Sequence, residues 1–167
     1  MGGSPLKIVS NGLAVIEKYV AIVLMFSMTT VMALAVLFRY FLNSPLSWAG
    51  EAAVFLLVWI SFIGGSLGLK YKAQASVTIL LDAIPSVWRK ALLITGNTLI
   101  ILFLVIVLYY SYQWVLSSSV LAQKSNNLQL PMWIPFSAVP IGLSCAFIHI
   151  LANVEELFRR EESEWKL

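Results

Sequence analysis

The sequence predicts an all-α integral membrane protein with four transmembrane helices and a short interfacial amphipathic helix between the second and the third. Of its 167 residues, 60% are hydrophobic and only 11% are charged, and the mean hydropathy is +0.88. A soluble domain could not hide that much apolar surface, so the solvent must be lipid. Four long segments with almost no charge and an uneven distribution of lysine and arginine support this prediction, and residues 1–167 are expected to form one membrane domain.

Composition also excludes several classes of protein. The single cysteine, Cys145, cannot form an internal disulfide, a CxxC redox pair or a cysteine metal cluster. The formal net charge is +3, which in a membrane chain indicates cytoplasmic lysines and arginines rather than a nucleic-acid partner.

The first two predicted spans enclose long uncharged runs. Crossing the hydrocarbon core as a helix takes about 20 apolar residues. Residues 17–40 enclose the twenty uncharged residues Tyr19–Phe38, an anchor that is too long and starts too late for a cleavable signal peptide. Residues 48–70 enclose eighteen more, Ala52–Leu69.

The turn between these spans has one charge at each rim. It reads "FRYFLNSPLSWAGE", with Arg39 near its start and Glu51 at its end. One interpretation is anchoring, in which Arg39 reaches toward lipid headgroups and Glu51 stabilises the start of the next helix. The other is that Arg39 and Glu51 form an ion pair across the hairpin, or pair with a partner subunit, and the sequence leaves both interpretations open.

The second span carries small residues on one face. Gly64 and Gly68 form a GxxxG motif, and Ser61 and Gly65 lie four residues apart alongside it. Small residues let helix backbones approach closely in a membrane. This face is therefore expected to contact another helix rather than lipid.

Between the second and third spans, residues 74–90 combine apolar and polar side chains at helical spacing. The pattern predicts a short amphipathic helix in the inner membrane interface, begun or broken by Pro85, and an ordinary loop with apolar anchors is the alternative. The apolar face holds Val77, Leu80, Leu81, Ile84 and Trp88, and the polar face holds Thr78, Asp82, Ser86 and Arg89.

The third and fourth spans complete the predicted bundle. The third is residues 91–116 and the fourth is residues 131–154. The prolines of the fourth span fall in its first part, where a helix tolerates proline best, so Pro140 is expected to bend this helix or to mark its beginning. The tail that follows is expected to continue the helix into the cytoplasm.

Lysine and arginine set the predicted orientation. Four spans put both termini on one side, and nine of the eleven cationic side chains fall at the termini or in the central loop. Because cytoplasmic segments carry the excess of lysine and arginine, both termini are predicted to be cytoplasmic. The nine are Lys7, Lys18, Lys70, Lys72, Arg89, Lys90, Arg159, Arg160 and Lys166, and the other two are Arg39 and Lys124.

Residues capable of chemistry are scarce within the predicted spans. His149, one turn after Cys145, is the one ionisable residue expected well inside a span. Two side chains do not make a zinc site, and a packed histidine is the favoured interpretation. The only aspartate, Asp82, lies in a loop, and no motif supports a serine nucleophile. We therefore predict no catalytic residue, metal or cofactor, and no enzyme.

Two stretches of the chain resemble a known family. The stretch "RYFLNSPLSWAGEAAVFLLVWISFIGGSLGLK" and the later "LPMWIPFSAVPIG" are similar to the small membrane subunit (Q subunit, DctQ-like) of tripartite ATP-independent periplasmic (TRAP) transporters. The chain departs from the family at Gly50, where members often carry a second acid, and at residues 74–78, which replace a frequent His–Ile–x–Val–Asp pattern. The matching residues are Arg39, Ser47, Trp48, Glu51, Trp59, Gly64, Pro131, Met132, Trp133, Pro140 and Gly142.

This resemblance implies a subunit rather than a complete transporter. In the family a large membrane subunit holds the substrate and sodium sites, and a periplasmic binding protein delivers a carboxylate-bearing solute such as a sialic acid or a dicarboxylate. The small subunit would sit in the lipid of the bacterial inner membrane, scaffold the large subunit and help to dock the binding protein, with no substrate site of its own. Candidate structural and interface residues are Arg39, Trp48, Glu51, Trp59, Gly64, Gly68, Pro131, Met132, Trp133 and Pro140.

Two other functions compete with this one. The first is a self-sufficient small transporter or channel that oligomerises through Gly64 and Gly68. The second is a membrane enzyme that uses His149 or Cys145.

Overall fold

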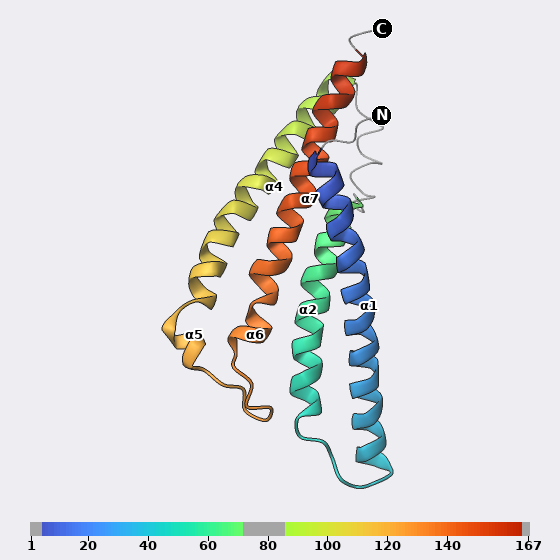
Figure 1. The fold of residues 1–167 in the computed structure, drawn as a ribbon, viewed down its shortest axis with the longest axis vertical. Coiled ribbons are helices and arrows are strands. Elements are labelled where there is room, and N and C mark those ends of the chain that lie inside the picture. Colours follow the sequence, from blue (N-terminus) through green and yellow to red (C-terminus); the bar gives the residue numbers. More distant parts are fainter. Residues whose placement is uncertain (1–4, 72–85, 165–167) are drawn as a thin grey trace.

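The structure, a computed structural model, describes residues 5–71 and 86–164 (Figure 1). These residues form helices and one isolated bridge, between Lys124 and Pro131, and contain no β-strand. The helices are α1 (Pro5–Tyr40), α2 (Ala49–Lys70), α4 (Ser86–Val115), α5 (Ser118–Ala122), α6 (Trp133–Phe136) and α7 (Ala138–Glu164).

Four of the helical segments are long and apolar enough to cross a membrane, which confirms the predicted number. They are Pro5–Tyr40, Ala49–Lys70, Thr95–Val115 and Trp133–Glu155. The main difference from the sequence prediction is in α1, which has 36 residues and begins well before residue 17.

The predicted interfacial helix lies mostly outside the described residues. Of the predicted segment 74–90, the structure describes residues 86–90 as the beginning of α4. The start of α1 and the end of α7 lie at the same end of the molecule, as an even number of spans requires (Figure 1).

Three of the long helices form the core. α1 packs along α2, α2 packs along α7, and α1 also reaches α7, whereas α4 packs mainly on α7. Small side chains line these contacts, including Ala49 and Ala53 of α2 and Ala138 and Ala146 of α7, all of which are buried. Close helix approach through small residues is typical of membrane bundles.

α2 and α7 approach each other closely at Gly142. A Cβ atom at this position would lie 2.7 Å from Cβ and 3.0 Å from the backbone carbonyl carbon of Phe62. Because part of this contact is backbone, Phe62 cannot simply rotate away. Gly142 therefore sets how closely α7 packs against α2.

Prolines shape the start of the fourth span. Pro135 lies in α6, a single turn, and Ser137 separates α6 from α7. Pro140 lies in the first turn of α7, so it marks the beginning of this helix, where its missing N–H is tolerated.

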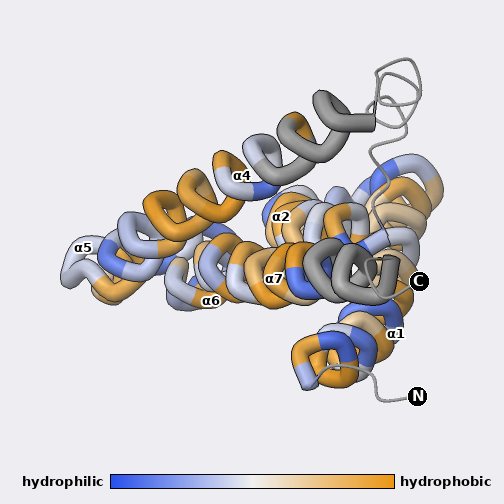
Figure 2. Tube along the Cα trace, turned by 90° about the horizontal axis from the view of Figure 1, so that it is seen from above, coloured by the Kyte–Doolittle hydropathy of each residue, from blue (hydrophilic) through white to orange (hydrophobic). Residues whose placement is uncertain are grey.

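The outer surfaces of the long helices are apolar. Figure 2 shows hydrophobic residues along the middle of α4 and of α7, and Phe26 of α1 and Phe103 of α4 are 74% and 63% exposed. Surfaces of this kind suit lipid or an apolar partner rather than water.

Candidate functional site

Glu51 organises the end of the molecule where α2 begins. Its carboxylate accepts three backbone hydrogen bonds from the loop between α5 and α6: Asn126 N–H at 3.0 Å, Asn127 N–H at 2.9 Å and Leu128 N–H at 2.9 Å. Successive amides that point at one anion form a backbone nest, and hydrogen bonds to a charged acceptor are among the stronger ones. Glu51 thus connects the second helix to the segment before the fourth span.

The loop that receives Glu51 is closed by its own hydrogen bonds. Ser125 N–H donates to Leu130 O at 2.9 Å, and Leu130 N–H donates back to Ser125 Oγ at 3.1 Å. Met132 N–H donates to Gln123 O at 2.9 Å, which places the two ends of the loop side by side. This closure turns the three central amides toward Glu51. We call residues 123–132 the bracket loop.

The ion pair between Arg39 and Glu51 that the hairpin suggested is absent from the described part of the chain. Arg39 lies in the last turn of α1, whereas both oxygens of Glu51 are occupied by the bracket loop. Glu51 does stand in the first turn of α2, where a negative charge is favourable. Pairing across the hairpin is absent because backbone amides of the bracket loop, which a sequence does not display as charges, donate to the Glu51 carboxylate. Pairing of Arg39 or Glu51 with a partner subunit stays a prediction.

The structure brings several other candidate residues close to the same end. Trp48 is the N-cap residue of α2, and Pro131 forms the isolated bridge with Lys124. Met132 and Trp133 follow directly, as the N-cap and first residue of α6. The two sequence motifs that carry the family resemblance thus meet through Glu51 and the bracket loop.

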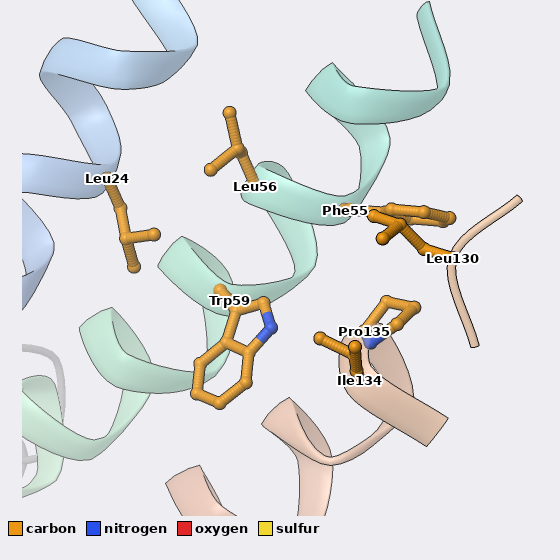
Figure 3. A pocket seen from close by; sticks show the side chains of 7 residues that line it. All are labelled: Leu24, Phe55, Leu56, Trp59, Leu130, Ile134 and Pro135. Atoms are coloured by element: carbon orange, nitrogen blue, oxygen red, sulfur yellow. The ribbon is translucent and has the colours of Figure 1, made fainter. Parts of the chain in front are cut away.

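Trp59 lines an apolar pocket of about 240 Å³ between α1, α2 and the segment around α6 (Figure 3). Within the described part of the chain its indole N–H has no hydrogen-bond acceptor, and Figure 3 shows the nitrogen on the side of Ile134 and Pro135. The pocket is lined by Leu24, Phe55, Leu56, Trp59, Leu130, Ile134 and Pro135.

The glycines of the predicted contact face have free space beside them in the described structure. A Cβ atom added at Gly64, Gly65 or Gly68 would meet nothing within 4 Å in the described structure. Nearby Ser61 donates to the carbonyl of Leu57 in its own helix at 2.8 Å. Among the described residues, this face of α2 is therefore not used to pack against another helix, in contrast to Gly142.

A buried polar cluster joins α1, α2 and α7 at the opposite end. His149 is fully buried, with Nδ1 2.7 Å from Ser10 Oγ and Nε2 2.7 Å from Glu17 Oε2. Lys70 donates to Ser10 O at 2.7 Å, to Asn11 Oδ1 at 2.9 Å and to Ser10 Oγ at 3.1 Å.

Sequence reasoning missed most of this cluster. His149 was expected to be a packed histidine, but no role was predicted for Glu17, which stands at the edge of the predicted first span. The available signal was the spacing of Ser10, Ala14 and Glu17, which are one helical face and the only buried residues of α1.

The order of Ser10, His149 and Glu17 is that of a serine–histidine–acid triad, yet its surroundings do not suit a nucleophile. Ser10 is 4% exposed and its hydroxyl also contacts the ammonium of Lys70. A catalytic hydroxyl needs access to substrate and donors for an oxyanion. We therefore assign this cluster to helix packing.

Comparison with known proteins agrees with these observations. The family described as "Tripartite ATP-independent periplasmic transporters, DctQ component" matches residues 28–160. The match includes the hairpin after α1, the bracket loop and most of α7.

Curated relatives are similar over much of the chain. The C4-dicarboxylate TRAP transporter small permease protein DctQ of Vibrio cholerae is 26% identical over 151 residues, covering 77% of this chain and 65% of that protein. The protein of the same name from Rhodobacter capsulatus is 27% identical over 99 residues, covering 59% of this chain and 44% of that protein. The chain thus spans less than two thirds of the length of these two relatives.

A third relative is a longer polypeptide. The isethionate TRAP transporter permease protein DctMQ of Oleidesulfovibrio alaskensis is 24% identical over 107 residues, which are 64% of this chain but 17% of that protein.

Proposed function

The chain belongs to the DctQ component family of tripartite ATP-independent periplasmic transporters, and on that premise we propose that it is an accessory small membrane subunit of such a transporter. In this proposal it scaffolds a large membrane subunit in the bacterial inner membrane and helps to dock a periplasmic binding protein. The complex imports a carboxylate-bearing solute with sodium, and this chain holds no substrate site. The family is one of transporter permease subunits, which is not a class of enzyme.

The observation that carries the proposal is how the polar groups of the spans are used. Glu17 and His149 bond to each other, and Glu51 bonds to backbone amides of the bracket loop. Transport sites in membranes use ionisable groups or unwound helices that face a pathway. Here these groups hold helices and loops together instead, which supports a scaffold.

A large partner subunit is supported by the DctMQ relative, whose matched segment is a small part of a much longer chain. On this chain, the glycine face of α2 (Ser61, Gly64, Gly65 and Gly68) is the surface that we propose for the partner helix. It has room for a backbone to approach, and it is not needed for packing within the chain.

Trp59 offers a second contact for that partner. Its indole N–H lacks an acceptor in the described residues and lies near the middle of α2, where no water would satisfy it. We assign the pocket beside it to an apolar side chain of the large subunit, with an acceptor for the indole on the same helix.

The proposed topology follows the sequence. Both termini lie in the cytoplasm because of the lysine and arginine bias, which places the bracket loop and the α1–α2 hairpin on the periplasmic side. The bracket loop is then the surface that we propose for the binding protein.

Co-purification tests the proposal directly. The tagged chain, extracted from native membranes in mild detergent, should carry the large membrane subunit with it in a fixed ratio. A chain that is recovered alone, or only with copies of itself, would instead favour the self-sufficient oligomeric transporter or channel.

A further inference from the structure

We propose that Lys70, Ser10, His149 and Glu17 form one directed hydrogen-bond chain that fixes α1 against α2 and α7. In this hydrogen-bond chain the imidazole of His149 is neutral and carries its proton on Nε2. This site is independent of the proposed transport role, because none of its residues belongs to the glycine face, the Trp59 pocket or the bracket loop.

Lys70 sets which atoms donate and which accept along the hydrogen-bond chain. An ammonium group has three N–H donors and no acceptor. The three acceptors around Lys70 Nζ are Ser10 O at 2.7 Å, Asn11 Oδ1 at 2.9 Å and Ser10 Oγ at 3.1 Å, so each N–H has one. Ser10 Oγ is therefore an acceptor toward Lys70, and its own proton is left for another partner.

That partner is His149. Ser10 Oγ lies 2.7 Å from Nδ1, and in the proposed arrangement the hydroxyl donates its free proton to this nitrogen. When Nδ1 accepts, a neutral imidazole carries its proton on Nε2. Nε2–H then donates to Glu17 Oε2 at 2.7 Å, which completes the chain.

Charge balance supports the same assignment. With a neutral imidazole, the cation of Lys70 and the anion of Glu17 sum to zero across the chain. A protonated imidazole would direct a second cationic donor at the Ser10 oxygen that already accepts from Lys70. Two cationic donors at one hydroxyl oxygen repel each other.

The hydrogen-bond chain fixes the rotation of α1 about its axis because few other side chains distinguish one face of α1 from another. Its buried residues in the described structure are Ser10, Ala14 and Glu17, and the rest of its surface is largely apolar. Apolar side chains gain no hydrophobic advantage from helix contact within lipid, so packing alone leaves the rotation of such a helix poorly defined. A buried polar contact that forms in only one rotation of the helix favours that rotation.

The assignment is testable on the intact chain because His149 is its only histidine. Nitrogen NMR of the full-length protein, labelled with ¹⁵N-histidine in a lipid nanodisc at neutral pH, reports one imidazole. We expect one neutral tautomer, protonated on Nε2 and unprotonated on Nδ1. A tautomer protonated on Nδ1, or an imidazolium, would overturn the proposal without any variant being needed.

Two serine variants test the direction of the chain. Ser10→Ala removes the donor to Nδ1, so the single-tautomer signal should be lost and the amides of residues 10–17 should exchange with deuterium several-fold faster. Ser61→Ala is the matched control, since Ser61 bonds only within its own helix, and it should change neither reading. An unchanged histidine spectrum in Ser10→Ala would contradict the proposed hydrogen bond from Ser10 to His149. Unchanged deuterium exchange would contradict the role of that bond in positioning α1.

Discussion

At Gly142, α7 approaches α2 so closely that even one added carbon would collide with Phe62. We predict that Gly142→Ala destabilises the protein, because overpacking a tight contact costs about 1–3 kcal/mol. Thermal unfolding in detergent measures the effect. Gly65→Ala is the control, because its Cβ would enter open space and alanine is the better helix former; its melting temperature should stay the same or rise. Equal losses in both variants would contradict the close contact.

Glu51 supports a second prediction at the residue scale. Glu51→Gln removes the negative charge that attracts three amides, so the bracket loop should loosen while α2 remains folded. Hydrogen–deuterium exchange at Asn126, Asn127 and Leu128 should become faster.

Arg39→Gln is the control for this prediction. In the structure Arg39 takes no part in the bracket loop, so the same amides should keep their protection. If Arg39→Gln made these amides exchange as fast as Glu51→Gln does, an ion pair between Arg39 and Glu51 would explain the protection of the loop better than the amide contacts do.

Single residues show where sequence reasoning stops. The sequence singled out Glu51 correctly as an unusual charge, since a lone carboxylate beside an apolar span is conspicuous. Its partners were not predictable, because backbone amides of a loop more than seventy residues away have no signature in composition. Glu17 was overlooked for the opposite reason, since it stands next to Lys18 at the edge of a span and resembles an ordinary rim charge.

The helices themselves were largely predictable. Long uncharged runs predicted four spans, and four suitable helices are present in the described residues. The length of α1 was underestimated, because Lys7, Glu17 and Lys18 interrupt the apolar run while the helix continues through them. Hydropathy detects the part of a helix that suits lipid, not the part held by polar contacts with its neighbours.

The open glycine face of α2 gives a prediction at the element scale. Gly64→Leu and Gly68→Leu should leave the isolated chain about as stable as before, since a Cβ atom at either position meets nothing within 4 Å, but should reduce recovery of the large subunit in co-purification several-fold. Gly12→Leu is the control, because Gly12 is equally open but lies on α1. Loss of the partner in all three variants would show that added bulk in general, rather than this face, disrupts the complex.

On the scale of the whole molecule, three helices form a core and α4 packs against one side of it. Hydrogen bonds join the core at both ends. At one end they connect Ser10, Glu17, Lys70 and His149, and at the other they connect Glu51 to the bracket loop. Polar groups used in this way join the helices to one another and leave the apolar outer surface to meet lipid and a partner. Such an arrangement suits a scaffold better than a carrier that must change shape.

Transport by reconstituted vesicles tests this central claim most directly. Vesicles that contain the large membrane subunit, this chain and the binding protein should accumulate a carboxylate-bearing solute when sodium is supplied outside. Vesicles with this chain alone should show no flux, and those lacking only this chain should lose most of the uptake. Sodium-driven or passive flux through the chain by itself would contradict the role of an accessory scaffold.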